Sequence, residues 1–262
     1  MLKTTDEDIE EARANQDRSK MKSFSISAKL FIALVIACGI GVLGYAAMHR
    51  EAMVVARFAA FLVITVAAAR LNVRLPGIDG SMSVNLPFIL IALTQLSFLE
   101  TVVIACCSAL IQCFWNGRKT DAVKVLFNVC NMANSVGGAY FVYNLAGLGS
   151  PLLTKALLLA GAAAIYFLIN TAPVAIIIGL VEKKSAILTW SNVFLWTYPY
   201  YLASAGVASM VNGMSHIVGW QTPLLVLPVV YGVHCSYKKY FSGSQQEKPS
   251  DPQKLRASAA HN

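Results

Sequence analysis

The sequence predicts an all-α fold: a polytopic membrane bundle of about eight transmembrane helices with both termini in the cytoplasm. Three observations lead to this prediction. Of the 262 residues, 56% are hydrophobic and only 13% are charged, whereas about a quarter of an average soluble domain is charged. Long apolar runs alternate with short charged patches, which is the pattern expected when lipid is the solvent. The basic residues gather beside alternate runs, as the positive-inside rule requires.

The first half of the chain contains a polar segment and four apolar runs. Residues 1–24 are polar and rich in charge, and we expect them to form a cytoplasmic N-terminal segment. The apolar runs predict helices over residues 27–48, 54–71, 84–98 and 99–115. The last two have about 15–17 residues each, which is short for a hydrocarbon core of roughly 30 Å, so we expect partial or tilted spans here.

The second half predicts four more helices, over residues 121–145, 151–181, 185–210 and 222–238. Thr120 is the predicted N-cap of the first, and Ser150-Pro151 predicts a cap followed by proline at the first helical position of the second. Pro199 interrupts the third. The transmembrane domain therefore covers residues 25–241, and the polar residues 242–262 form a disordered cytoplasmic tail.

The distribution of basic residues tests this count independently of hydropathy. With the N-terminus inside, 18 of the 21 Lys and Arg residues fall on cytoplasmic segments, and only Arg50, Arg57 and Lys155 fall outside. A missed or invented span in the middle of the chain would scramble this distribution. The net charge of +8 is therefore explained by membrane orientation. No basic face alternates with aromatic residues, so nucleic acid is not an expected partner.

The sequence also lacks the residues on which catalysis and ion coupling depend. The acidic residues nearest the spans, Glu51, Glu100, Asp121 and Glu182, all lie at predicted helix ends. Coupled transporters usually keep a carboxylate inside the membrane. No hydrolase, nucleotide-binding or metalloprotease motif occurs, and the six cysteines lie in or beside apolar runs without metal-ligand spacing. We therefore expect no enzyme activity, no metal and no cofactor.

The densest polar pattern lies in the predicted helix 121–145. Asn128, Asn131, Ser135 and Gly138 follow one another at i, i+3, i+7 and i+10 and so share one helix face. An amide in hydrocarbon is costly unless it is paired, so this face must meet other helices. It either joins helices or contacts a ligand. The expected partners at the same depth are Asn85, Gln112, Asn170 and Asn192.

The predicted helix 185–210 combines aromatic and polar residues, including Trp190, Trp196, Tyr198, Tyr200 and Tyr201. Some belong to an interfacial belt, but the stretch from Trp196 lies too deep for all of them to do so. An aromatic-lined cavity is the alternative. The candidate ligand-binding residues are therefore Asn85, Gln112, Asn128, Asn131, Ser135, Asn170, Asn192, Trp196 and Tyr200.

The segment from Arg70 to Ser83 is the most distinctive polar stretch between predicted spans. It contains two turn-forming pairs, Pro76-Gly77 and Asp79-Gly80. It is also too apolar for a free linker. We expect a re-entrant or lid-like element at the cytoplasmic mouth, or else an ordinary loop that carries two positive-inside arginines.

Three stretches carry a resemblance to a known bacterial module. They are residues 70–85 (RLNVRLPGIDGSMSVN), 125–129 (VLFNV) and 196–202 (WTYPYYL). They resemble the multi-helix membrane region that precedes output domains of HD-GYP or GGDEF signalling proteins, over about residues 54–240. The resemblance implies a sensory input domain. The sequence ends about 20 residues after the last predicted helix, so we expect no output domain here.

Together these patterns predict a non-catalytic, multi-pass protein of the bacterial inner membrane that resembles a signalling input module. Besides the lipid bilayer, the expected partners are a small apolar or amphipathic ligand and a cytoplasmic or membrane signalling protein. The alternative is an uncoupled small-molecule transporter. The sequence identifies neither the ligand nor the oligomeric state.

Overall fold

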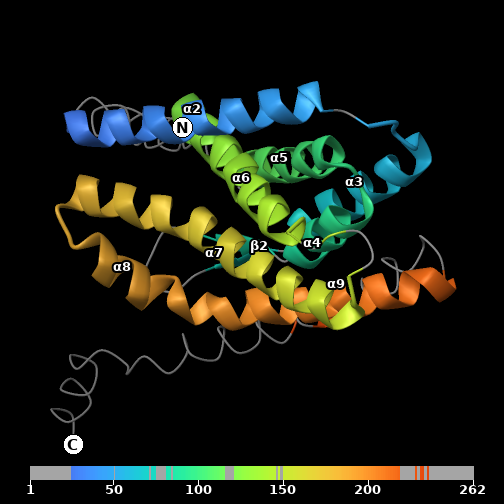
Figure 1. Cartoon of the computed structure of the whole chain (residues 1–262). Helices are drawn as coiled ribbons and strands as arrows, with labels where there is room; N and C mark the ends of the chain where they lie inside the picture. Colours follow the sequence, from blue (N-terminus) through green and yellow to red (C-terminus); the bar gives the residue numbers. More distant parts are fainter. Residues whose placement is uncertain are drawn as a thin grey trace, which may run out of the picture.

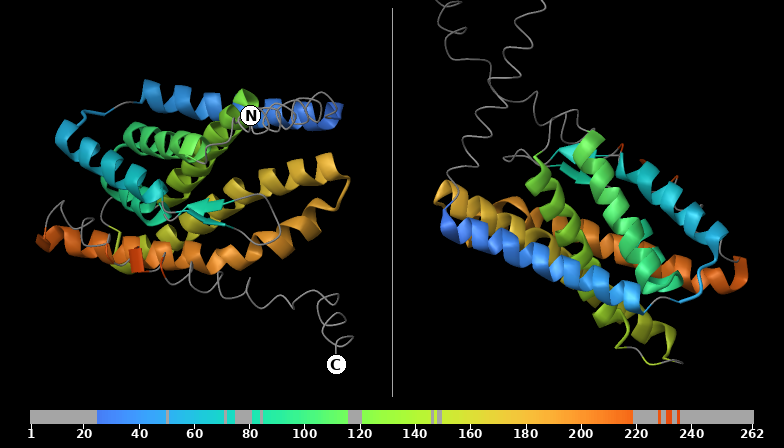
Figure 2. Two further views of the ribbon diagram at one scale, coloured as in Figure 1. Left: turned by 180° about the vertical axis from the view of Figure 1, so that it is seen from behind. Right: turned by 90° about the horizontal axis from the view of Figure 1, so that it is seen from above.

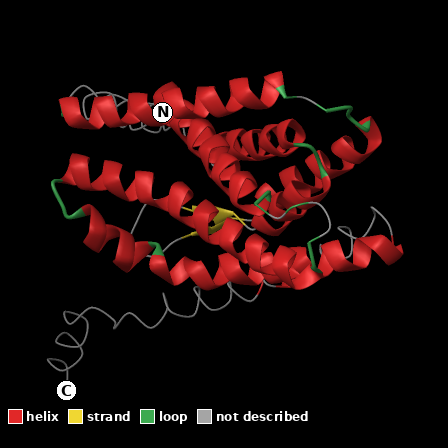
Figure 3. Ribbon diagram, viewed as in Figure 1, coloured by secondary structure: helices red, strands yellow, loops and turns green. Residues whose placement is uncertain are grey.

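The computed structural model describes residues 25–49, 51–70, 72–74, 81–83, 85–115, 121–145, 147 and 150–218, with four isolated positions beyond them. These residues form a bundle of helices with one short hairpin (Figures 1 and 3). The predicted segments 1–24 and 242–262, and nearly all of the predicted helix 222–238, lie outside the described residues. Over the described part of the chain, the predicted all-α fold class is confirmed apart from the hairpin.

Helix α2 (Ile26–Met48) turns small residues toward the bundle and large apolar residues outward. Ser25 begins the helix by accepting a hydrogen bond from the Ala28 amide at 3.2 Å. The buried positions are Ala28, Val35, Gly39 and Ala46. The exposed large side chains are Ile26, Leu30, Leu34, Ile40, Tyr45 and Met48. A helix in a soluble protein buries its large apolar residues, so this inverted arrangement is typical of packing in lipid.

Helix α3 (Val55–Ala69) leads into an antiparallel hairpin of strands β1 (Asn72–Arg74) and β2 (Ser81–Ser83). The register pairs Asn72 with Ser83 and Arg74 with Ser81. We expected a packed element in this segment, but not strand pairing, because three residues are too few for an alternating pattern to show. The hairpin precedes α4 and lies at the edge of the bundle in the right-hand view of Figure 2.

Helix α4 (Leu86–Gln95) is enclosed by other elements. Every residue from 86 to 93 is buried, and the helix packs against α3, α5 and α9. With 10 residues it is about 15 Å long at 1.5 Å per residue. That length is about half of a hydrocarbon core. The predicted helix 84–98 is therefore corrected to residues 86–95, and the partial or tilted span expected here stays a prediction.

Helix α5 (Phe98–Trp115) follows α4 after two residues because a capping box begins it. Ser97 Oγ accepts a hydrogen bond from the Glu100 amide at 3.4 Å, while Glu100 Oε2 accepts from the Ser97 amide at 2.9 Å and from the Ser97 hydroxyl at 2.7 Å. This reciprocal arrangement satisfies helix-terminal donors in a buried place. The Ser-x-x-Glu signature accounts for a connection in which the apolar pattern showed no loop.

Helix α6 (Ala122–Tyr143) runs through the middle of the bundle and contacts α2, α5 and α7 (Figure 1). Its N-cap is Asp121, which accepts a hydrogen bond from the Val123 amide at 3.0 Å, and not the predicted Thr120. Two glycines set its packing distances. A Cβ on Gly39 of α2 would lie 2.5 Å from Cys130 Cβ, and a Cβ on Gly138 would clash with Ile169 of α7. The contact at Gly39 includes the Cys130 backbone, so α2 approaches α6 more closely than a larger residue would allow, whereas the Ile169 side-chain end beside Gly138 could move aside.

Helix α7 (Leu152–Glu182) has 31 residues and continues through Pro173. At 1.5 Å per residue it is about 46 Å long, which exceeds the hydrocarbon core. Pro151 is its N-cap, so the prediction of proline at the first helical position was wrong by one residue. The helix ends at Lys183, which adopts the left-handed conformation with φ 54°.

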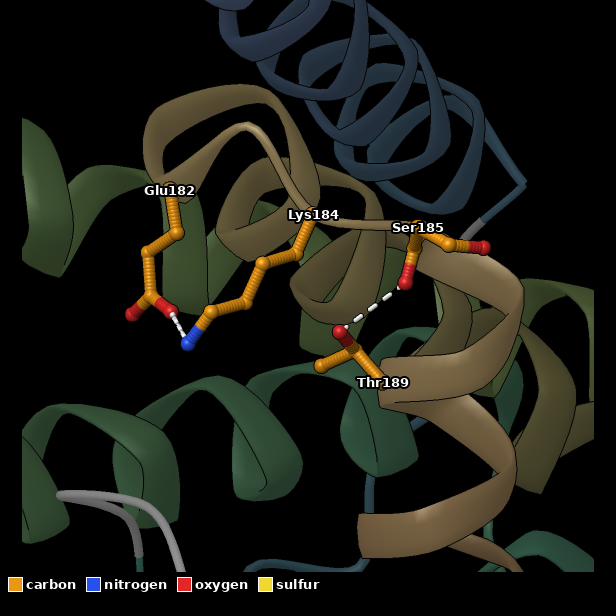
Figure 4. A network of polar contacts seen from close by, with 4 residues as sticks. All are labelled: Glu182, Lys184, Ser185 and Thr189. Carbon is orange, nitrogen blue, oxygen red and sulfur yellow. Dashed lines mark hydrogen bonds and ion pairs between the residues drawn. The ribbon is translucent and has the colours of Figure 1, made fainter.

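A short turn connects α7 to α8 (Ala186–Val193), and Figure 4 shows its polar contacts. Lys184 Nζ pairs with Glu182 Oε2 at 2.8 Å. Ser185 begins α8, since its hydroxyl oxygen accepts from the Leu188 amide at 3.4 Å and its carbonyl accepts from the Thr189 hydroxyl at 3.0 Å. The Ser185 contacts start α8 immediately after the turn, and the exposed ion pair lies beside them.

The predicted helix 185–210 is broken in two. After α8 the chain makes one 3₁₀ turn, η1 (Leu195–Thr197), and then forms α9 (Tyr198–Val218). Pro199 is the second residue of α9. Inside a continuous helix, proline would remove a hydrogen bond, but in the first turn its missing N–H has no partner to lose. The break therefore falls just before the proline.

Helices α2, α8 and α9 run roughly along the length of the bundle, while α6 crosses it obliquely (Figure 1). The N-terminal end of α2 and the α7–α8 turn lie at one end, and the α2–α3 connection lies at the other (Figures 1 and 2). Among the described helices, α2 and α7 are long and apolar enough to cross a membrane, while α3, α4 and α5 are shorter apolar helices.

Candidate functional site

Four side chains form an inner polar cluster where α6, α7 and α9 meet: Asn131, Ser135, Asn170 and Tyr201. Asn131 Nδ2 donates to the carbonyl oxygen of Asn170 at 2.9 Å, and Asn170 Nδ2 donates to Tyr201 Oη at 3.3 Å. Ser135 Oγ donates to the carbonyl oxygen of Asn131 at 2.8 Å. The cluster thus brings together three predicted candidates and links three helices.

Asn131 is buried but incompletely satisfied. Its side chain is only 3% exposed, and its Oδ1 atom has no hydrogen-bond partner. Leaving a buried amide oxygen unpaired costs about 1–3 kcal/mol. Asn131 Oδ1 can therefore accept a hydrogen bond from one more donor, such as a hydroxyl group or a water molecule.

An aromatic seam continues the cluster between α7 and the α8–α9 segment. It consists of Tyr166, Phe167, Trp190, Tyr198, Tyr200 and Tyr201. The Phe167 ring centroid lies 5.6 Å from that of Trp190, 5.2 Å from that of Tyr198 and 4.9 Å from that of Tyr201. These spacings are those of directly packed rings. Trp190, Tyr198 and Tyr201 therefore pack against α7, and Tyr200 is buried beside Tyr201.

Polar contacts fix both borders of the aromatic seam. Trp190 Nε1 donates to Thr171 Oγ1 at 2.9 Å, and Tyr166 Oη donates to Met132 Sδ at 2.7 Å. Sequence reasoning missed Tyr166 and Thr171. Their signal was a spacing within α7, because Tyr166 and Asn170 are four residues apart, as are Phe167 and Thr171, and such pairs share a face.

The remaining candidates lie outside the inner polar cluster. Asn85 is buried and donates to Ser108 Oγ at 2.9 Å, which joins α4 to α5. Gln112 is partly buried on α5, and its Nε2 atom has no partner. Asn192 is exposed on α8. Trp196 is 84% exposed, so it faces away from the bundle.

Asn128 also leaves the predicted polar face. Its side chain is exposed, and Nδ2 makes a contact with Cys113 Sγ at 3.5 Å. Three residues of an α-helix turn by about 300°, so Asn128 lies about 60° around the axis from Asn131. That rotation is sufficient to place one amide inside the bundle and the other at its surface.

The chemistry available at the inner polar cluster is recognition through hydrogen bonds. Its four members include no carboxylate, imidazole, thiol or amine, so none of them could act as a general base toward the two hydroxyl groups. Over the part of the chain that the structure describes, no three His, Cys, Asp or Glu side chains gather as metal ligands would.

The described helices form a bundle with exposed apolar faces and an internal polar cluster, an arrangement that suits a membrane-associated domain. Residues 18–238 match the MASE9 family, so the chain belongs to this family of membrane-associated sensory domains. The expected sensory input domain is thereby confirmed at the level of the family, without the HD-GYP or GGDEF context. The comparison with curated proteins gave no match.

Proposed function

We propose that this chain is a non-catalytic sensory input module of the inner membrane that binds a small amphipathic ligand at the inner polar cluster. The observation that carries the proposal is the buried, unpaired Asn131 Oδ1. It lies on the residue whose Nδ2 bridges α6 to α7. A ligand hydroxyl would supply the missing donor, and the aromatic seam would take the apolar body.

Binding at this place would act on the position of α9. Asn170 and Tyr201 connect α7 to α9 through a 3.3 Å hydrogen bond, which is long for a neutral pair. A ligand that competes for the Tyr201 hydroxyl would favour a shifted α9. It changes the equilibrium only by its differential affinity for the two arrangements. A cytoplasmic or membrane signalling partner would then detect the shift.

The proposal includes the predicted eight-helix arrangement with both termini in the cytoplasm, in which the short α4 crosses only part of the bilayer. Lys183 and Lys184 lie in the α7–α8 turn, at the same end as the start of α2 (Figure 1). Lys155 lies at the start of α7, at the opposite end of that helix. This distribution of positive charge supports the predicted orientation. A multi-pass location in the inner membrane is part of the same proposal.

Photolabelling with a diazirine analogue of octanol tests the ligand site directly. This probe combines a hydroxyl donor with an apolar chain, as the cluster requires. Purified full-length protein in lipid nanodiscs is labelled, and the modified residues are mapped by mass spectrometry. We expect labels on α6, α7 and α9 near Asn131, and we expect excess unlabelled octanol to reduce them.

Two asparagines on α6 provide a matched pair for this experiment. Asn131→Leu removes the unpaired oxygen and should abolish labelling at the cluster. Asn128→Leu changes an exposed amide on the same helix and should leave labelling unchanged. Equal labelling of the parent and the Asn131→Leu variant would reject the inner polar cluster as the ligand site, as would labels confined to the exposed face of α2.

A further inference from the structure

A second polar site lies apart from the inner polar cluster, where the start of α3 meets the end of α4. Arg57 is the third residue of α3, and Gln95 is the last residue of α4. Arg57 Nη2 donates to Gln95 Oε1 at 3.4 Å. The arginine therefore points into the bundle, although the start of a transmembrane helix would allow it to reach outward to the headgroups.

Arg57 has no counter-ion among the described residues. Their only ion pair is that between Lys184 and Glu182, at the far end of α7. The neighbouring acid Glu100 is 7% exposed and holds the capping box with Ser97. A partly buried guanidinium cannot lose its proton, so its charge must be compensated by some other group.

Two hydrogen-bond donors at this site have no acceptor. Arg57 Nε and Gln95 Nε2 are both buried and without a partner in the structure. Nε and Nη2 lie on the same edge of a guanidinium, which is the edge that binds carboxylate or phosphate in a bidentate manner. A positive charge with unpaired donors beside it calls for an acidic oxygen group.

We propose that Arg57 and Gln95 form a binding site for an oxyanion, a phosphate or carboxylate group, at the extracytoplasmic end of the bundle. The oxyanion accepts from Arg57 Nε and Nη2 on one side and from Gln95 Nε2 on the other. The 3.4 Å bond between the two side chains opens in this process. It is a weak bond, and charge-assisted bonds replace it. The site is independent of the ligand proposed for the inner polar cluster.

Thermal unfolding in an uncharged maltoside detergent tests the site, with inorganic phosphate, acetate or phosphatidylglycerol as the added oxyanion. Sodium chloride at equal ionic strength controls for general screening. An oxyanion that binds only the folded protein raises the melting temperature progressively with its concentration. A rise with phosphate or acetate identifies a soluble oxyanion, whereas a rise with phosphatidylglycerol alone identifies a lipid headgroup.

Variants at three positions assign the effect to the site. Arg57→Gln should abolish the oxyanion-dependent rise, and Arg57→Lys should weaken it, because lysine keeps the charge but loses the fork. Lys155→Gln removes another cation at the same end of the bundle and should leave the rise intact. Gln95→Glu should raise the melting temperature without any additive and remove the response, because an internal carboxylate then occupies the guanidinium.

The proposal is overturned if no oxyanion stabilises the parent more than chloride does. It is also overturned if Arg57→Gln keeps the response, or if Lys155→Gln loses it to the same extent. Should Arg57→Gln fail to fold, Gln95→Glu decides in its place. This variant must show a higher melting temperature together with a lost response, and an unchanged response rejects the site.

Discussion

At the scale of single residues, two asparagines on α6 illustrate how burial decides the role of an amide in lipid. Asn131 is buried, and its Nδ2 bridges α6 to α7, whereas Asn128 is exposed three residues earlier. Both occur in the same apolar sequence context. The difference arises from their angular position on the helix, because the inward amide donates to a backbone carbonyl of α7, whereas the outward amide contacts the Cys113 sulfur of α5 at 3.5 Å.

With Asn131 Oδ1 paired by a water molecule or a ligand hydroxyl as proposed, Asn131→Leu should lower the stability of the folded protein by about 0.6 kcal/mol, the average measured for hydrogen bonds between membrane helices. The variant loses the bond to the Asn170 carbonyl, while leucine itself is favourable in lipid. Thermal unfolding in detergent provides the measurement, with Asn128→Leu as the matched control. A more stable Asn131→Leu protein would mean that the unpaired Oδ1 costs more than the bond contributes.

Gly39→Ala should destabilise the contact between α2 and α6 by about 1–3 kcal/mol, as overpacking does elsewhere. The new Cβ would lie 2.5 Å from Cys130 Cβ and 2.6 Å from Cys130 Cα, so α2 itself must move. Gly41 of the same helix has nothing within 4 Å. Gly41→Ala should therefore be neutral or stabilising, and equal effects of the two substitutions on thermal unfolding would contradict the packing shown here.

The candidate site could be predicted only in part from the sequence. Residue type and helical spacing identified Asn131 and Ser135, because residues four apart share a helix face and this spacing can be read from the sequence alone. Tyr166 was not identified, since its importance depends on contact with α9 and with Met132. Trp196 looked like a buried aromatic residue, but the 3₁₀ turn before Pro199 directs it outward.

At the scale of elements, apolar runs located the helices, whereas local hydrogen bonds fixed their ends. The runs gave α2, α6 and α7 to within a few residues. The sequence did not give the length of α4, because its apolar run passes without interruption into that of α5. Only the capping box at Ser97 and Glu100 separates the two helices. The break between α8 and α9 is also set locally, by Pro199, and it lies just before this residue.

Ser97→Ala should destabilise the start of α5 by about 1 kcal/mol, the usual contribution of an N-cap side chain. It removes the acceptor of the Glu100 amide and one of the two donors to Glu100 Oε2. Ser97→Thr keeps the hydroxyl and should behave like the parent protein. Chemical or thermal unfolding in detergent measures both, and an equally stable Ser97→Ala variant would show that the capping box contributes nothing.

At the scale of the whole molecule, orientation in the membrane depends on where the chain reverses direction. Among the described residues, Lys29, Lys183 and Lys184 lie at one end of the bundle, and Arg57 and Lys155 lie toward the other. The hairpin and the short α4 make the region between α3 and α5 the least regular part of the bundle. The segment after α9 decides on which side the C-terminus lies.

Single cysteines in a Cys-less version of the chain test the complete topology. Thr5→Cys, Arg118→Cys, Lys184→Cys and Ser250→Cys should resist an impermeant maleimide in intact cells and react after permeabilisation, because the positive-inside rule places all four in the cytoplasm. Lys155→Cys should react in intact cells and serves as the positive control. If Ser250→Cys also reacts while Lys184→Cys does not, the chain crosses an odd number of times after α7, and the predicted helix 222–238 is not a span. If Arg118→Cys reacts instead, the number of spans is miscounted among α3, α4 and α5. The short α4 is then the helix that does not cross the membrane.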